Sequence, residues 1–123
     1  MKVVVFNPAG GPIIAEVTSG QAQPGSYTLR VWEAHANTLV LKERGNFINS
    51  DDDAYKLPLP NKQNHERIVE SISTAVITPP IKDYALRLSI QQDGKEIGFE
   101  ESVGKASSAT VTADLFVMLE AAP

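Results

Sequence analysis

The dipeptide Asp93-Gly94 is the feature that most constrains the fold of this chain. It lies between an alternating segment, residues 84–92, and a second segment with β-strand character, residues 95–99. A type I′ turn needs positive φ at both central residues, and Asp-Gly meets that need at little steric cost. Strict alternation of apolar and polar residues before the turn is typical of a half-buried antiparallel strand. We therefore expect a β-hairpin, whose predicted buried face carries Tyr84, Leu86, Leu88 and Ile90.

Short segments with strand character also fill most of the remaining chain, with turn-forming residues between them. They cover residues 3–6, 13–18, 26–34, 38–43, 54–57 and 107–120. Residues 67–78 are rich in β-branched side chains, which favour a pleated sheet. We interpret this segment as a strand, with a helical turn near His65 as the alternative.

Seven to nine short strands separated by turns predict an all-β protein, and no segment has the pattern of a long amphipathic helix. We expect one domain over residues 1–123, an antiparallel β-sandwich. The pattern resembles the immunoglobulin-like architecture, which implies a fold and carries no function.

Composition excludes several classes of function. The chain has 11 basic and 15 acidic residues, a net charge of −4 and no polybasic run, so we expect no nucleic-acid partner. It has no cysteine, which excludes disulfides and thiolate metal sites and favours a cytoplasmic location. The apolar run at residues 3–6 is too short for the hydrophobic region of a signal peptide. A leader that had already been removed would not be visible in this sequence. We also expect no membrane span, because no segment approaches about 20 apolar residues.

The segment Asn49–Asp53 contains three consecutive aspartates, the type of ligand that Ca²⁺ prefers. Asp51 and Asp53 are weak metal candidates, but an EF-hand is ruled out because Lys56 and Lys62 stand where glycine and glutamate are needed. We favour a solvated acidic loop and expect no metal or other cofactor. A Ca²⁺ site outside the EF-hand type is the alternative.

The sequence shows no recognisable catalytic set. His35 and His65 are the two histidines, and both fall in segments that we expect at the surface. Neither a nucleophile elbow nor a His-Glu-x-x-His helix is present. We therefore predict no catalytic residue. A small barrel-type enzyme is an alternative, in which His35 or a buried Asp114 would act as acid or base.

Trp32 and Arg30 are the candidates for a ligand or partner surface. By alternation they share one face of a strand, opposite the apolar face that carries Tyr27, Leu29 and Val31. An exposed Trp beside an Arg forms a platform for a sugar ring or for a partner's side chain. The interpretation we prefer is that Trp32 fills a core, as tryptophans in sandwiches often do.

Phe116 and Met118 are the candidates for a subunit interface. They stand opposite the core face of the last predicted strand, so this strand is apolar on both faces near its end. Cover within the same subunit is the first interpretation, and contact with another subunit is the second. Subunit contact would most simply form a two-fold dimer.

Together these features predict a non-catalytic module that acts through binding or assembly surfaces, with a protein partner or a second copy of itself. The first alternative is a carbohydrate-binding module that uses Trp32, with Ca²⁺ held by the acidic loop. The second alternative is the barrel-type enzyme.

Overall fold

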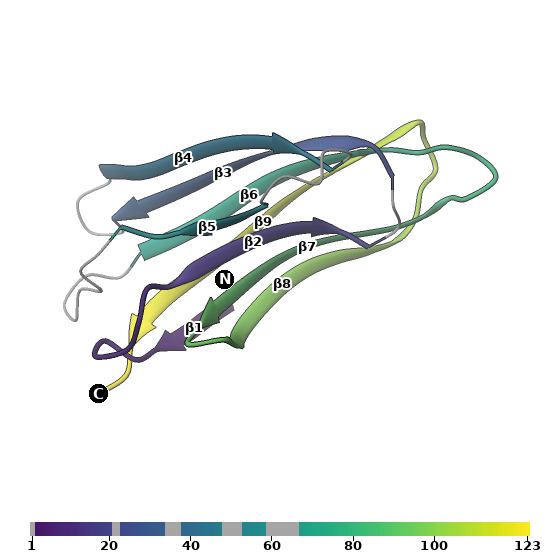
Figure 1. The fold of residues 1–123 in the computed structure, drawn as a ribbon. Helices are drawn as coiled ribbons and strands as arrows, with labels where there is room; N and C mark the ends of the chain where they lie inside the picture. Colours follow the sequence, from purple (N-terminus) through teal and green to yellow (C-terminus); the bar gives the residue numbers. More distant parts are fainter. Residues whose placement is uncertain (1, 21–22, 34–37, 48–52, 59–66) are drawn as a thin grey trace.

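The computed structural model describes residues 2–20, 23–33, 38–47, 53–58 and 67–123. These residues form nine β-strands and no helix (Figure 1). The strands are β1 (Lys2–Phe6), β2 (Ile14–Ser19), β3 (Gly25–Glu33), β4 (Thr38–Asn46), β5 (Ala54–Lys56), β6 (Arg67–Val76), β7 (Asp83–Gln92), β8 (Lys95–Lys105) and β9 (Thr110–Ala121). The all-β class is therefore confirmed. Residues 67–76 are a strand as predicted, whereas the alternative helical turn near His65 lies outside the described residues.

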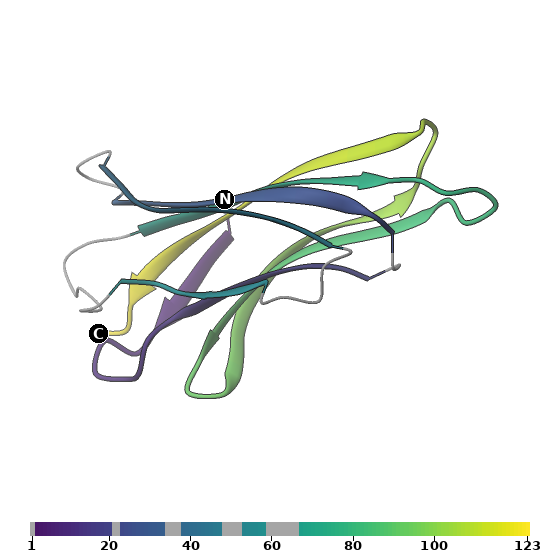
Figure 2. The same cartoon turned by 45° about the horizontal axis from the view of Figure 1, so that its top comes forward.

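The strands form two sheets that pack face to face. One sheet has five strands in the order β1-β9-β6-β3-β4, and the other has four in the order β5-β2-β7-β8. Figure 2 shows them as two layers. Among the described strands, every pair is antiparallel except β1 with β9, which run parallel. The parallel pair was not predicted, because the sequence of residues 3–6 says nothing of its distant partner.

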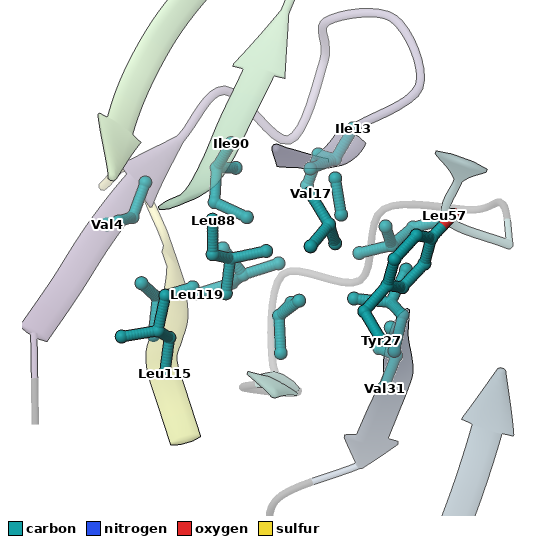
Figure 3. Close-up of a cluster of buried hydrophobic side chains, with 14 of the residues drawn as sticks. Val4, Ile13, Val17, Tyr27, Val31, Leu57, Leu88, Ile90, Leu115 and Leu119 are labelled. Carbon is teal, nitrogen blue, oxygen red and sulfur yellow. The ribbon is translucent and has the colours of Figure 1, made fainter. Parts of the chain in front are cut away.

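The core lies between the sheets and follows the predicted alternation. On β7, Leu86, Leu88 and Ile90 are completely buried. The facing strand β9 contributes Leu115 and its alternate neighbours to the same cluster (Figure 3). Val111, at the start of β9, is only half-buried.

The β7–β8 connection is the predicted turn. Asp93 has φ 52° and Gly94 has φ 77°, and β8 returns in register with Gln92 opposite Lys95. Both central residues thus adopt the positive φ that a type I′ turn requires.

Gln92 fixes the position of β1 relative to this hairpin. Its side chain is buried; its Oε1 accepts a hydrogen bond from the Asn7 amide at 2.9 Å. Its Nε2 donates to the carbonyls of Asn7 at 2.8 Å and Gly11 at 3.0 Å. The loop after β1 is therefore tied to the end of β7, which helps to hold β1 at the edge of the five-stranded sheet.

Candidate functional site

One row of apolar side chains crosses the outer face of the five-stranded sheet. Val3 pairs with Met118, Met118 with Ile68, Ile68 with Trp32, and Trp32 with Leu39. The five residues come from β1, β9, β6, β3 and β4, so every strand of the sheet contributes one. We call this set the apolar row. It lies on the side away from the core, where an alternating strand ordinarily carries polar residues.

A β-bulge completes the apolar row at β4. The register between β3 and β4 shifts between Val31 and Trp32, so that Val31 pairs with Leu41 and Trp32 with Leu39. The extra residue, Val40, packs against the core. Without this bulge Val40 would lie opposite Trp32, and Leu39 would be displaced from the row.

Exposed apolar residues concentrate on this same face. Among the described residues, seven large hydrophobic side chains are exposed, and five of them lie on the outer face of the five-stranded sheet: Val3, Val5, Leu39, Val76 and Phe116. Val3 is 46% exposed and Leu39 is 40% exposed, whereas Met118, Ile68 and Trp32 between them are half-buried. No described strand lies over this face (Figure 2). Contiguous exposed apolar surface of this kind is a mark of interaction sites.

Arg30, Glu70 and Phe116 form the neighbouring row, one step along the strands. Arg30 pairs with Glu70 across β3 and β6, and Glu70 pairs with Phe116 across β6 and β9. The Arg30 Nη1 atom lies 3.8 Å from the Glu70 Oε1 atom. Phe116 is 37% exposed. A cation, a carboxyl group and an aromatic ring therefore lie directly beside the apolar row.

Glu70 is held in an environment that disfavours its charge. Burial raises the pKa of the Glu70 carboxyl, and a hydrogen bond with Asp114 and the charge of Asp114 raise it further, while Arg30 lowers it. The Glu70 side chain is only 12% exposed.

The structure brings together two sets of residues that the sequence presented separately. Trp32 and Arg30, the candidate ligand surface, and Phe116 and Met118, the candidate interface, share one sheet face. The preferred placement of Trp32 in a core is wrong, because its side chain is half-buried on the outer face. Phe116 is exposed, so it is not covered within the described part of the subunit.

Sequence reasoning missed several residues of this surface: Val3, Ile68, Leu39 and Glu70. Ile68 and Glu70 lie on the outer side of β6, but the sequence there has two apolar residues followed by two polar ones, so no local alternation marks this side. The link between that face and Trp32 depends on strand register, which no local pattern contains.

The other candidates are not part of this surface. Asp114 is exposed, so it is not the buried acid or base of the enzyme alternative. His35, His65 and Asp51 lie outside the described residues. Within the described ranges, no group of three or more histidine or acidic side chains is placed to hold a metal ion.

Asp53 is engaged by the protein itself. Its Oδ1 accepts a hydrogen bond from the Tyr27 hydroxyl at 2.9 Å, and its carbonyl accepts one from the Val17 amide at 2.9 Å. The Tyr27 and Tyr55 hydroxyls are 2.5 Å apart. Burial, followed by the hydrogen bonds with Tyr55 and Asp53, raises the pKa of Tyr27 above its usual value, so this hydroxyl stays neutral. Asp53 therefore helps to join β5 to β3 across the sandwich.

A pocket of about 380 Å³ lies at one end of the sandwich, between the β6–β7 and β8–β9 connections. Its lining residues are Ile77, Pro79, Lys82, Ala106, Ser107, Ser108 and Ala109. Lys82 is the one titratable side chain in this lining, so the pocket offers no acid–base pair.

Among the described residues, no helix has both the length and the apolar character needed to cross a membrane. Comparisons of the chain with protein-family models, with curated proteins and with solved structures find no match.

Proposed function

We propose that this protein is a non-catalytic module that binds a macromolecular partner, or assembles, through the outer face of its five-stranded sheet. The observation that carries this proposal is the apolar row, which crosses all five strands on the side away from the core. Burying such a row gains about 25 cal/mol for each Å² of apolar surface removed from water. Without a binding role, such an exposed apolar face would lower the solubility of the protein and bring no benefit.

The anatomy of the face also supports a binding role. Interface centres are typically enriched in aromatic residues, Met and Arg. Here Trp32, Phe116, Met118 and Arg30 lie within two adjacent rows of one sheet. The immunoglobulin-like description of the sandwich remains a prediction, and the proposal does not depend on it because fold alone does not set function.

Site-specific photo-crosslinking tests this proposal. A photo-reactive phenylalanine analogue replaces Phe116 on the proposed face, and a matched control replaces Val103, which is 61% exposed on the other sheet. We expect adducts from position 116 and few from position 103. Adducts from position 103 alone, or equal yields from both positions, would contradict the proposal.

Carbohydrate binding on the same face is a second candidate. It is favoured by one observation: the half-exposed indole of Trp32 lies beside Arg30 and Glu70, whose polar groups can bond sugar hydroxyls. Titration calorimetry with soluble oligosaccharides tests it. Binding that is lost in Trp32→Ala and kept in Val103→Ala supports the sugar platform; no heat with any oligosaccharide speaks against it.

A further inference from the structure

Strand β9 is only partly paired on the side where β1 lies. β1 pairs with β9 from Lys2, opposite Val117, to Phe6, opposite Ala121. β9 begins earlier, at Thr110, and no described strand pairs with residues 110–116 on this side. Figure 2 shows β1 beside the C-terminal part of β9 only. We call residues 110–116 of β9 the open edge.

The main-chain groups that face this side can be assigned from two hydrogen bonds. The Ile77 amide donates to the Ala109 carbonyl, and the register between β6 and β9 continues from there without a shift. Odd-numbered residues of β9 therefore direct their N–H and C=O groups toward β6. The Ala122 amide donates to the Phe6 carbonyl, so the even-numbered residues point toward the side of β1. The N–H and C=O groups of Thr112 and Asp114 thus point out of the open edge, where no described strand receives them.

The core is also less well covered beside the open edge. Val117 and Leu119, which lie beside β1, are completely buried. On the same side of β9 but beyond β1, Leu115 is 5% exposed, Ala113 is 8% exposed and Val111 is half-buried. A strand that continued the line of β1 would cover these three side chains.

The other edge strands of the described sheets carry features that oppose pairing with a foreign strand. β8 has exposed lysines at both ends, and its half-buried Glu100 lies on the core side, opposite Leu88. β4 has exposed Lys42 and Arg44 and a β-bulge. β1 and β5 are only five and three residues long. The open edge has no lysine, no proline and no register shift, so it lacks the protection that sheet edges ordinarily have.

We propose that the open edge takes up an extended, basic segment of a partner protein, which adds a strand to the five-stranded sheet in line with β1. In this mode of recognition, main-chain hydrogen bonds provide the affinity, and alternate side chains provide the specificity. The segment would pair with the free main-chain groups of Thr112 and Asp114 and cover Ala113 and Leu115. This inference goes beyond the proposed function, because it uses the edge of the sheet and not its outer face.

The basic character of the segment follows from Asp114. Asp114 is the one charged residue of the open edge, its side chain is exposed, and no basic side chain among the described residues forms an ion pair with it. Its neighbour Glu70 has a raised pKa and shares a hydrogen bond with it. An opposite charge directly across from a strand residue stabilises the pairing, whereas a like charge opposes it. A lysine or arginine opposite Asp114 is therefore the residue that this edge selects.

Binding of a synthetic peptide tests the inference. The probe is a seven-residue peptide of alternating valine and lysine, which spans roughly 23 Å when extended and so matches the open edge. Its valines can cover the core side while its lysines lie beside Asp114. By titration calorimetry, we expect the natural chain to bind this peptide at least about tenfold more tightly than a peptide of alternating valine and glutamate. The lysine peptide with every amide nitrogen methylated should not bind, because it cannot donate to the strand.

Three substitutions locate the peptide on the chain. Thr112→Pro removes an amide that points out of the open edge and leaves the pairing with β6 intact, so it should abolish binding. Thr112→Val keeps that amide and should bind as the natural chain does. Val103→Pro is the matched control on β8: the Ala106 amide donates to the Lys82 carbonyl, so odd-numbered residues there point away from β7. It should also bind normally.

Hydrogen exchange gives a second measurement on the natural chain, which does not depend on how well the proline variants fold. The amides of Thr112 and Asp114 should exchange quickly in the free chain and at least about tenfold more slowly with the lysine peptide bound. The amides of Ala113 and Leu115, which point toward β6, should be protected in both states.

Four results would overturn the inference. They are no binding of the lysine peptide, equal binding of its methylated form, unchanged exchange at Thr112 and Asp114 in its presence, and loss of binding in Val103→Pro with binding kept in Thr112→Pro. Self-association of the natural chain that disappears in Thr112→Pro would make a second copy the occupant, and so would overturn the assignment to a partner protein. None of these results bears on the photo-crosslinking at position 116, which tests the outer face separately.

Discussion

The outer faces of the two sheets differ in how their side chains are satisfied. On the four-stranded sheet, Glu96 accepts hydrogen bonds from Arg87 at 2.5 Å and from Ser89 at 2.6 Å. The Arg87 guanidinium also stacks over the Phe99 ring, 4.0 Å from its centroid. On the five-stranded sheet, the corresponding central positions carry the apolar row. The four-stranded sheet pairs these central polar groups with one another, whereas the five-stranded sheet carries most of the exposed large apolar side chains among the described residues.

This difference supports the proposal that the outer face of the five-stranded sheet binds a partner. A side chain that already has its partner in the same subunit gains little from a second protein, because its hydrogen bonds are only exchanged. An exposed apolar side chain gains free energy from any cover that removes it from water. The contrast lies in the outward residues alone, since both faces rest on the same core (Figure 3).

The largest change in stability is expected in the core beneath the four-stranded sheet. Leu88 alternates with Arg87 and Ser89 on β7 and is completely buried. We expect Leu88→Ala to lower the free energy of unfolding by about 2–5 kcal/mol, through lost transfer energy and a residual cavity. Urea denaturation measures the change. A loss below about 0.5 kcal/mol, typical of surface substitutions, would mean that the two sides of β7 are reversed.

The turn that joins β7 to β8 should give the next largest effect. Gly94 has φ 77°, and a Cβ placed there meets no other atom within 4 Å. Gly94→Ala should therefore destabilise the protein by about 1 kcal/mol through backbone conformation alone. Thermal denaturation provides the measurement, with Gly94→Asn as a control that tolerates positive φ better. Equal losses in the two variants would show that the cost is not set by φ.

A matched pair of truncations compares the two outer faces directly. Glu96→Ala removes the acceptor shared by Arg87 and Ser89, and because this pair is more than one third exposed we expect a loss of only about 0.2–1 kcal/mol. Phe116→Ala, on the outer face of the five-stranded sheet, should change the free energy of unfolding of the monomer by less than about 0.5 kcal/mol. It should instead weaken association through that face. Chemical denaturation at low protein concentration isolates the first effect, and sedimentation the second. A larger stability loss for Phe116→Ala than for Glu96→Ala would contradict this contrast, because Phe116 would then stabilise the folded monomer itself.

The smallest expected effect is a pH dependence of the free energy of unfolding, caused by Glu70 on the outer face of the five-stranded sheet. Because the pKa of Glu70 is raised in the folded protein, the folded state binds more protons than the unfolded state between the ordinary glutamate value and the raised one. The contribution of Glu70 to the free energy of unfolding therefore falls as pH rises through that interval and is largest below it. Glu70→Gln should remove this slope and leave stability at neutral pH equal or higher. Denaturation at a series of acidic to neutral pH values, with Glu96→Gln as control, measures it; an unchanged slope in Glu70→Gln would contradict the assignment.

Much of the fold could be predicted from local patterns. Alternation at Leu86, Leu88 and Ile90 identified the buried side of β7, and Asp93-Gly94 identified the turn, because both signals are contained in adjacent residues. The β-branched run at residues 67–76 identified β6 for the same reason.

The proposed binding surface could be predicted only in pieces. Alternation placed Trp32 opposite the core face of β3 and Phe116 opposite that of β9, but the sequence could not show that β6 joins these strands into one sheet. Strand order and register depend on contacts between distant segments. The bulge that brings Leu39 opposite Trp32 likewise has no signature in the residues around it.

The parallel pairing of β1 with β9 has a consequence for the order of events during synthesis. These strands are neighbours in space, although β2 to β8 separate them along the chain, so their pairing closes the longest loop in the fold. Contacts of such long range form slowly and late, after more local hairpins are in place. The apolar row needs Val3 from β1 and Met118 from β9, so it is not complete until β9 has been synthesised and has paired with β1. The apolar row would therefore be complete only on molecules that have finished folding. This order limits association between chains that are not yet folded.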